Sequence, residues 1–315
     1  AVTSWISPNT DCGLTSSEVI TIELQNLGLL SVSDFELSYS LTIDGNTTVV
    51  SEIFSDTLDA NEIIQYSFTA NADFSVNGTY TCIATVNLAG DVEANNNSLT
   101  QEIVSIPIIS LPYFNDFESG TDFWIAGGTN SSWAMGTPTA STINSAYSGT
   151  NVWTTNLSGI NNESEDSYVE SPCFDFSSST VPAFEFKIWL DCYHWQTVGY
   201  EGVELYAIYD GSEHRIENAG VNENWYNFTQ VVALDYADGW SGVSGSWLNA
   251  FIEIPEISGK NIVKFKVVFK SLGYTLYDGF AFDDVHIFDN SGDLELVSIN
   301  TPVNGCQGAT SGEVS

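Results

Sequence analysis

Positive charge is scarce in this sequence. Its 315 residues include 6 Lys and Arg against 41 Asp and Glu, which gives a formal net charge of −35. A surface this negative repels the phosphates of nucleic acids and the headgroups of anionic lipids. We therefore expect neither nucleic acid nor a membrane surface among the partners.

Long apolar runs are missing as well. No stretch approaches the ~18 apolar residues of a membrane-spanning helix, so we expect no membrane insertion. The first residue is Ala1 rather than Met, and no basic segment followed by an apolar one stands at the start. The sequence is interpreted as a mature or excised part of something longer, monomeric in this form.

Apolar and aromatic residues are plentiful, at 43% and 13%, which excludes wholesale disorder. The length suggests about two domains. Residues 17–105 form short runs in which apolar and polar residues alternate between turn residues, a pattern that predicts a β-sandwich. Residues 113–290 form a second all-β unit, because no stretch keeps a helical apolar period with caps.

The first unit contains the run Ile-x-Leu-x-Asn-Leu-Gly, from Ile22 to Gly28. Tyr80 follows Asn77-Gly78 and precedes Cys82 by two residues, the spacing of a tyrosine corner. These features resemble the CARDB family, cell-adhesion-related modules of bacterial surface proteins. The resemblance implies an Ig-like β-sandwich over residues 1–107.

The second unit opens with FNDFESGTDFW, continues through GWSGVSGSWLNAFIEI and closes with YDGFAFDDVHI. This order resembles MAM-like jelly rolls, in particular those appended to secreted peptidases and adhesins of Bacteroidetes, and the related cleaved-adhesin modules. The resemblance implies a jelly-roll β-sandwich over residues 108–290. It also implies an adhesive or accessory role, and it places Trp124, Trp133, Trp153 and Trp189 in the core.

The end of the sequence is similar to its beginning. Both contain Pro-x-x-x-Cys, Pro8 to Cys12 and Pro302 to Cys306, followed by a Ser/Thr-rich run and Glu-Val. This predicts that residues 291–315 begin a further CARDB-like repeat, in which Cys306 lacks its partner.

The remaining four cysteines are then predicted to pair within their domains, as Cys12–Cys82 and Cys173–Cys192. Five buried free thiols are the alternative. Disulfides indicate an oxidising compartment, so we expect a secreted or cell-surface protein. No Cys-x-x-Cys occurs and no His stands at zinc-ligand spacing, which argues against structural zinc.

Acidic pairs stand at both ends of the second unit: Asp116 and Glu118 at its start, Asp283 and Asp284 near its end. The first and last strands of a jelly roll tend to lie side by side, and carboxylates brought close repel each other without a cation. Oxygen ligands suit Ca²⁺, and the resemblance implies calcium at these positions. We predict a structural Ca²⁺ site there, with the relative roles of Asp283 and Asp284 left open because successive residues of a strand face opposite ways. Two separately solvated acidic clusters are the alternative.

Exposed aromatic rings can stack on sugar rings. Tyr193 and Trp195, together with Trp240 and Trp247, are the candidate glycan-binding residues, although core packing is the stronger interpretation of large rings in this pattern.

All six basic residues lie between Lys187 and Lys270. Lys264 and Lys266 alternate with apolar residues such as Phe265, which predicts a strand with a buried face and a solvated lysine face. A small anion-binding stripe is the alternative.

Catalytic patterns are weak. Glu163 and Glu165 lack the spacing of a glycosidase carboxylate strand, and the three histidines stand outside any HExxH motif. We therefore expect no catalytic residues and a non-catalytic adhesion or binding region for a glycan or extracellular protein. The alternatives are an accessory region of a secreted hydrolase, such as a peptidase with its catalytic domain upstream, and a structural spacer.

Overall fold

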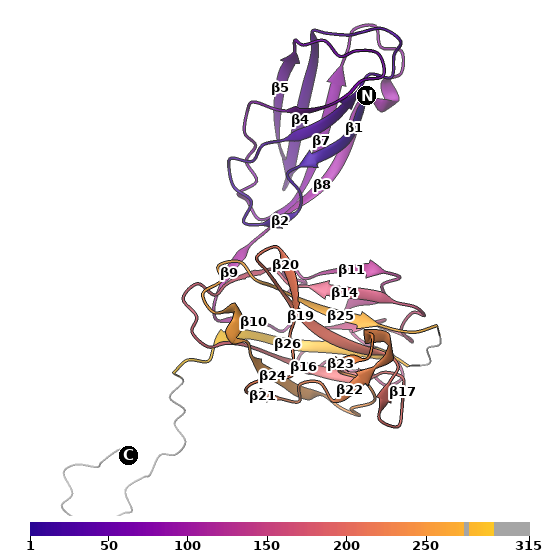
Figure 1. Ribbon diagram of the computed structural model, residues 1–315, viewed down its shortest axis with the longest axis vertical. Coiled ribbons are helices and arrows are strands. Elements are labelled where there is room, and N and C mark those ends of the chain that lie inside the picture. Colours follow the sequence, from indigo (N-terminus) through magenta and orange to yellow (C-terminus); the bar gives the residue numbers. More distant parts are fainter. Residues whose placement is uncertain (274–276, 293–315) are drawn as a thin grey trace, which may run out of the picture.

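The computed structural model describes residues 1–273 and 277–292. Within these ranges the chain forms 26 strands and three short 3-10 helices, η1 (Ala94–Asn96), η2 (Val232–Leu234) and η3 (Pro255–Ile257). The all-β prediction is confirmed. Strands β1 to β8 form one body and most later strands form another (Figure 1). The predicted repeat at 291–315 lies, beyond residue 292, outside the described residues.

The N-terminal body is a sandwich of two sheets with orders β1-β3-β6 and β2-β8-β7-β4-β5. Inward and outward residues alternate along β4, so that Leu37, Tyr39 and Leu41 are buried. The strands are β1 (Val2–Ser7), β2 (Asp11–Cys12), β3 (Thr21–Gln25), β4 (Phe35–Ile43), β5 (Asn46–Phe54), β6 (Ile63–Ser67), β7 (Gly78–Asn87) and β8 (Ser98–Ile106).

The second body is a larger sandwich of a seven-stranded and a five-stranded sheet. The seven-stranded sheet contains β10 (Tyr113–Asn115), β12 (Trp133–Gly136), β13 (Val152–Thr155), β16 (Pro182–Asp191), β21 (Asn222–Glu223), β24 (Leu248–Glu253) and β26 (Gly279–Asp289). The five-stranded sheet contains β11 (Ile125–Thr129), β14 (Asp166–Glu170), β19 (Gly202–Tyr209), β20 (Ser212–Arg215) and β25 (Lys264–Lys270). A small sheet of β17 (His194–Trp195), β18 (Val198–Gly199), β22 (Phe228–Val231) and β23 (Ala237–Gly239) lies at one edge.

Aromatic residues fill the space between the two larger sheets. Phe184 of β16 and Phe265 of β25 meet there with ring centroids 4.7 Å apart. Of the four tryptophans that the resemblance placed in the core, Trp124, Trp133 and Trp153 belong to this aromatic cluster. Trp189 is also buried, but in a smaller separate cluster with Ile143, Val152 and Ala281. Because large rings supply most of the apolar area, this core is an aromatic one.

The first and last strands of the second body are neighbours, as expected for a jelly roll. β10 pairs antiparallel with β26, with Tyr113 opposite Ile287 and Asn115 opposite Val285. The chain that leaves β10 at Asp116 therefore starts beside Asp283 and Asp284, in the middle of β26.

The two bodies meet at a short linker strand, β9 (Ile108–Ser110). Cys12 of β2 pairs with Ile106 at the end of β8, and Cys173 of β15 (Cys173–Asp175) pairs with Ile108 of β9. The same segment thus has one cysteine on each body as its neighbour.

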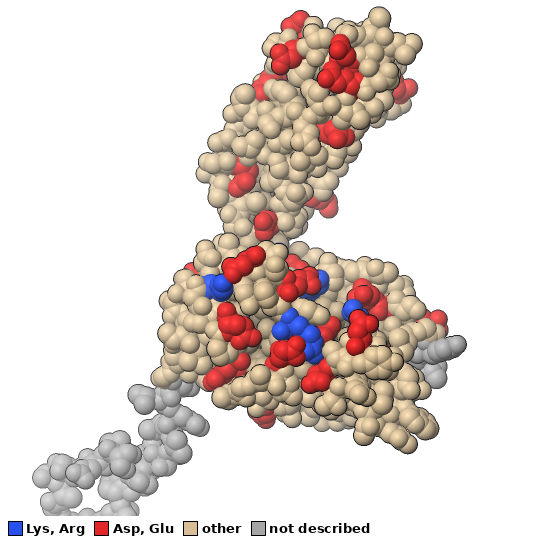
Figure 2. Space-filling model, viewed as in Figure 1, with Lys and Arg blue, Asp and Glu red and all other residues tan. Residues whose placement is uncertain are grey.

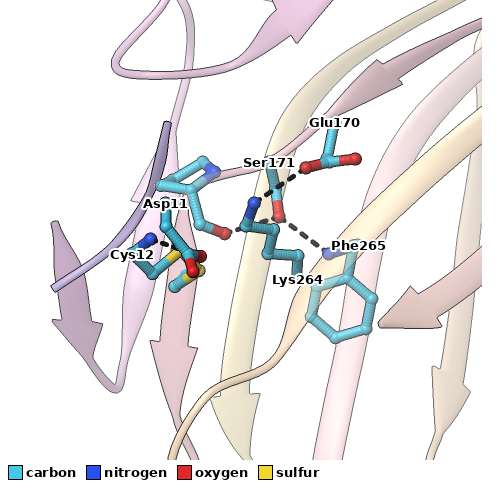
Figure 3. Close-up of a disulfide and its surroundings, with 8 residues drawn as sticks. Asp11, Cys12, Glu170, Ser171, Lys264 and Phe265 are labelled. Carbon is cyan, nitrogen blue, oxygen red and sulfur yellow. Dashed lines mark hydrogen bonds and ion pairs between the residues drawn. A yellow bond between two sulfur atoms is a disulfide. The ribbon is translucent and has the colours of Figure 1, made fainter. Parts of the chain in front are cut away.

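These two cysteines form a disulfide, Cys12–Cys173 (Figure 3). The predicted pairs Cys12–Cys82 and Cys173–Cys192 are therefore wrong. Cys82 points into the core of the first sandwich and Cys192 into the second, and both are buried unpaired thiols. Burial raises the pKa of the Cys82 thiol to about 12, so this thiol is protonated and inert.

Hydrogen bonds fix the disulfide on both sides. The Cys12 amide donates to Asp11 Oδ1 at 2.7 Å. Two residues before Cys173, the Ser171 hydroxyl accepts from the Phe265 amide at 2.8 Å, next to the ion pair between Lys264 and Glu170 (Figure 3). The junction is therefore anchored in the larger sandwich as well as the smaller one.

No helix among the described residues is long and apolar enough to span a membrane.

Candidate functional site

Three of the four predicted calcium ligands hold one loop, residues 147–151, just before β13. Glu118 Oε1 accepts from the amides of Thr150 at 2.8 Å and Asn151 at 2.7 Å. From the other side, Asp283 Oδ2 accepts from the Tyr147 amide at 3.0 Å. The residues from the start and end of the jelly roll thus reach the same structure, as their positions in the sequence predict.

Asp283 and Asp284 both contact Ser148, although successive residues of a regular strand face opposite ways. Asp283 Oδ2 accepts from the Ser148 amide at 3.1 Å, and Asp284 Oδ1 accepts from the Ser148 hydroxyl at 2.7 Å. The pairing of β16 with β26 slips by one residue at this point, and Asp284 adopts a left-handed φ of 45°. This bulge turns the second carboxylate toward the loop that the first one holds.

Gly149 is required at the centre of this loop. Its φ is +55°, in the left-handed region, and a Cβ there would lie 2.3 Å from Glu118 Cδ. A side chain at this position would therefore push the Glu118 carboxylate out of the loop.

Asp283 is an unusual carboxylate because its side chain is fully buried. Burial raises its pKa to about 6, with a further increase from the neighbouring Asp284, against the hydrogen bonds that it accepts. The Asp116 carboxylate accepts from the Glu118 amide at 3.2 Å. A buried carboxylate with further carboxylates nearby fits a hard cation in ligand type.

The number of protein ligands is small. Among the described residues, no three His, Cys, Asp or Glu side chains are grouped closely enough to hold a metal ion. A Ca²⁺ at this loop would need backbone carbonyls and water for much of its shell of 6–8 oxygens.

The four candidate aromatic residues occupy four different environments. Trp240 is only 1% exposed and packs on Trp225 and Tyr226 in the core, so its prediction as a ligand-binding residue is wrong. Trp195 is 64% exposed on the β17–β18 hairpin. The Tyr193 ring is stacked between Tyr200 and Tyr277.

Trp247 belongs to a patch on the outer face of the seven-stranded sheet. Its ring packs edge-on against Tyr147 and Trp189, with centroids 6.2 and 5.6 Å away. Tyr147 is 49% exposed, and Lys187 Nζ lies 5.3 Å from the centre of its ring. Lys187 also donates to Asn249 Oδ1 at 2.5 Å. We call Tyr147, Trp247, Lys187 and Asn249 the Tyr147–Trp247 patch.

The Tyr147–Trp247 patch is coupled to the acidic loop. The Tyr147 amide is the group that donates to Asp283, so the carboxylates fix the backbone from which the exposed ring projects. Sequence reasoning missed Tyr147 and Lys187. The signal available was the position of Tyr147 in the segment SAYSGTN, because this is the loop on which both acidic pairs converge.

The lysine face is as predicted, and its cations are matched by carboxylates. Phe265 and its apolar neighbours on β25 are buried, while Lys264 pairs with Glu170 at 2.9 Å and Lys266 with Glu213 at 2.6 Å. Figure 2 shows Lys and Arg side chains interspersed with acidic ones on one face of the jelly roll. This arrangement favours the solvated-face interpretation over an anion-binding stripe.

Glu165 is a structural carboxylate. It is buried, and it accepts from the Ser132 amide at 2.7 Å and from the Ser167 hydroxyl at 2.5 Å. Such a satisfied group has no oxygen available for a glycosidic bond, in agreement with the weak sequence pattern.

No family model matches the chain, so the names MAM and CARDB remain predictions. Over 186 residues, 59% of its length, the chain is 28% identical to bacillopeptidase F of Bacillus subtilis (strain 168), and it spans 11% of that protein.

Solved structures similar to this chain include adhesin and carbohydrate-binding modules. The match to the K1 cleaved adhesin domain of Lys-gingipain from Porphyromonas gingivalis W83 covers 57% of this chain and 99% of that domain, with a TM-score of 0.35 and 16% identity. The match to a CBM27 module of Caldicellulosiruptor saccharolyticus, solved with mannohexaose, covers 58% of this chain and 99% of the module, with a TM-score of 0.33 and 14% identity. The match to the module TmCBM61, solved with β-1,4-galactotriose, covers 55% of this chain and 94% of the module, with a TM-score of 0.34 and 15% identity.

Proposed function

We propose that this chain is a non-catalytic binding region of a secreted or cell-surface protein, and that its jelly roll binds a glycan. The Tyr147–Trp247 patch is the observation that carries the proposal. Its half-exposed Tyr147 ring can pack on the apolar face of a sugar, while Lys187 and Asn249 offer hydrogen bonds to hydroxyl groups.

The same proposal gives the acidic loop a role. Ca²⁺ bound by Asp283, Asp284 and Glu118, with Asp116 at the edge, would neutralise the carboxylates that hold loop 147–151. Its role would be structural, because these residues fix the backbone of Tyr147 and present no group for chemistry on a substrate.

Binding of mannohexaose and β-1,4-galactotriose, measured by isothermal titration calorimetry in about 10 mM calcium, tests the proposal. Tyr147→Ala and Trp247→Ala should each weaken binding by about tenfold or more, since aromatic contacts at the centre of an interface dominate its energy. Trp195→Ala is the matched control, because this ring is exposed but lies outside the patch. A larger loss with Trp195→Ala would move the site to the β17–β18 hairpin.

A second function is favoured by the match to bacillopeptidase F, a peptidase of which this chain spans a small part. Here the chain would be an accessory region of a secreted hydrolase, binding a protein rather than a glycan. The full reading frame decides this, because a catalytic set of residues would stand upstream. A structural spacer would bind neither sugar and would tolerate both patch substitutions.

A further inference from the structure

The N-terminal sandwich has a cavity of about 540 Å³ at the end remote from the jelly roll, where the N-terminus and η1 lie (Figure 1). We call it the tip pocket. Its floor is buried and apolar, with Leu24, Phe35 and Leu58 from the core of the sandwich. Its walls are two loops, residues 27–30 and 88–96. The volume is within the range of pockets that bury a ligand.

Three leucines and a valine stand out into solvent around this floor. Leu29, Leu30 and Val92 are 87, 79 and 99% exposed, and Leu27 is exposed as well. Monomeric proteins seldom expose large aliphatic side chains together, and apolar patches with a polar rim mark interaction sites.

Hydrogen bonds hold the loop of residues 27–30, which we call the leucine loop, in a fixed conformation. The side-chain amide of Asn26 is buried, and it donates to the carbonyl oxygens of Leu30 at 2.8 Å and Leu58 at 3.0 Å. Its Oδ1 accepts from the Gly28 amide at 3.0 Å. A fixed loop loses little conformational entropy when it binds, so these contacts prepare the leucines for a partner.

The charge around the pocket selects among partners. Asp91, Glu93 and the Ala1 ammonium line it, and residues 1–107 contain 14 Asp and Glu with no Lys or Arg, so the net charge is negative. A second copy of the same surface would be repelled by this charge, as would an anionic lipid surface. A segment with apolar side chains and flanking cations complements both the floor and the rim.

We propose that the tip pocket binds an extended segment of another protein in which apolar side chains are flanked by Lys or Arg. The apolar side chains enter the pocket between the leucine loop and Val92, and the cations lie beside Asp91 and Glu93. This site is separate from the Tyr147–Trp247 patch, on the other sandwich of the chain.

The probe is a fluorescein-labelled peptide, Lys-Leu-Phe-Leu-Lys with blocked ends, followed by fluorescence anisotropy on the full chain. The matched peptide Glu-Leu-Phe-Leu-Glu keeps the apolar core and reverses the charge. We expect saturable binding of the basic peptide with a dissociation constant below about 1 mM, at least tenfold weaker binding of the acidic one, and weakening in high salt.

Two double variants locate the site. Leu29→Asp with Leu30→Asp should weaken binding of the basic peptide at least tenfold, and Asp91→Asn with Glu93→Gln should weaken it about three- to tenfold. All four side chains are exposed, so folding is retained, and Val49→Asp on exposed β5 is the control that should change nothing.

Three results would overturn the proposal. The first is no binding of either peptide at about 1 mM, and the second is equal binding of both. The third is a dimer in sedimentation velocity that the Leu29→Asp, Leu30→Asp variant abolishes, since a second copy would then be the occupant. Glycan binding at the Tyr147–Trp247 patch is unaffected by any of these outcomes, so the two proposals fail independently.

Discussion

The two sandwiches of this chain accommodate acidic residues in different ways. The first has no Lys or Arg, and its best-placed carboxylate, Glu52, accepts hydrogen bonds from Tyr66, Thr69 and Ala70. The second contains all six cations, and several of its carboxylates form ion pairs, such as Glu204 with Arg215, while others, such as Glu165, accept hydrogen bonds as Glu52 does. An acidic chain can therefore position its carboxylates by hydrogen bonds alone where no cation is within reach.

The cores differ in a similar way. The jelly roll buries Trp, Phe and Tyr rings in one continuous cluster, while the first sandwich relies on aliphatic residues with fewer rings. If the two bodies are separate cooperative units, each core should control its own unfolding transition. The disulfide and the linker strand at the junction are the features that would couple them.

Removing one ring from the larger core should have the largest effect. Phe265 is fully buried among Phe174, Phe176 and Phe184, so Phe265→Ala should cost about 3–5 kcal/mol. Differential scanning calorimetry should show the jelly-roll transition about 6–20 °C lower and the other transition unchanged.

Phe74→Ala is the matched change in the first sandwich, where the Phe74 ring packs on Tyr80. It should lower the other transition. If either variant moved both transitions together, the two bodies would be one cooperative unit, and the comparison between separate cores would be lost.

Calcium should stabilise the jelly roll alone, by less than Phe265→Ala destabilises it. Extracellular sites have dissociation constants near 10⁻⁴ M, so about 10 mM Ca²⁺ adds roughly 2.7 kcal/mol relative to excess EDTA. We expect a rise of about 5–11 °C in the jelly-roll transition only. Asp284→Asn should remove this rise, because it neutralises a carboxylate on loop 147–151.

Asp166→Asn is the control for calcium, since this acidic residue lies on the opposite sheet beside Lys270. An unchanged transition, with no metal found by elemental analysis, would contradict the proposed calcium site. The carboxylates would then stabilise the loop through its amides alone.

The fold could be predicted because its signal is local. On β25, alternation alone places Phe265 inside and Lys264 and Lys266 outside, as observed. The meeting of the acidic pairs could be predicted from the adjacency of first and last strands. The bulge that turns Asp284 toward the loop could not, because a slip in pairing leaves no mark on the alternation.

The disulfide depended on information that spacing does not contain. Cys12 and Cys173 are 161 residues apart, and they meet because both strands pair with the segment that joins the two bodies. Pairing within each domain was the simpler hypothesis, but it ignored the linker as a common neighbour. The prediction that Trp240 binds a ligand was wrong for a related reason, because the presence of a ring in the sequence does not say on which side of a sheet the ring lies.

The smallest expected effect concerns Glu52 in the cation-free sandwich. Partial burial opposes its ionisation, yet hydrogen bonds from Thr69, Tyr66 and Ala70 lower its pKa to about 2, from 4.5. A lowered folded-state pKa means that its stabilisation is complete above about pH 4.5 and is lost as the pH falls toward 2. Allowing for solvent screening, the loss is about 1–2 kcal/mol.

Glu52→Gln should therefore lower the first transition at pH 7 and make it less sensitive to acid between about pH 4.5 and 2, as measured by thermal unfolding across that range. Glu102→Gln, an exposed change on β8, should leave the acid sensitivity as it is. If both variants responded alike, general charge repulsion would govern the acid response of this sandwich. Hydrogen bonds would then not be the substitute for cations that the contrast between the two bodies implies.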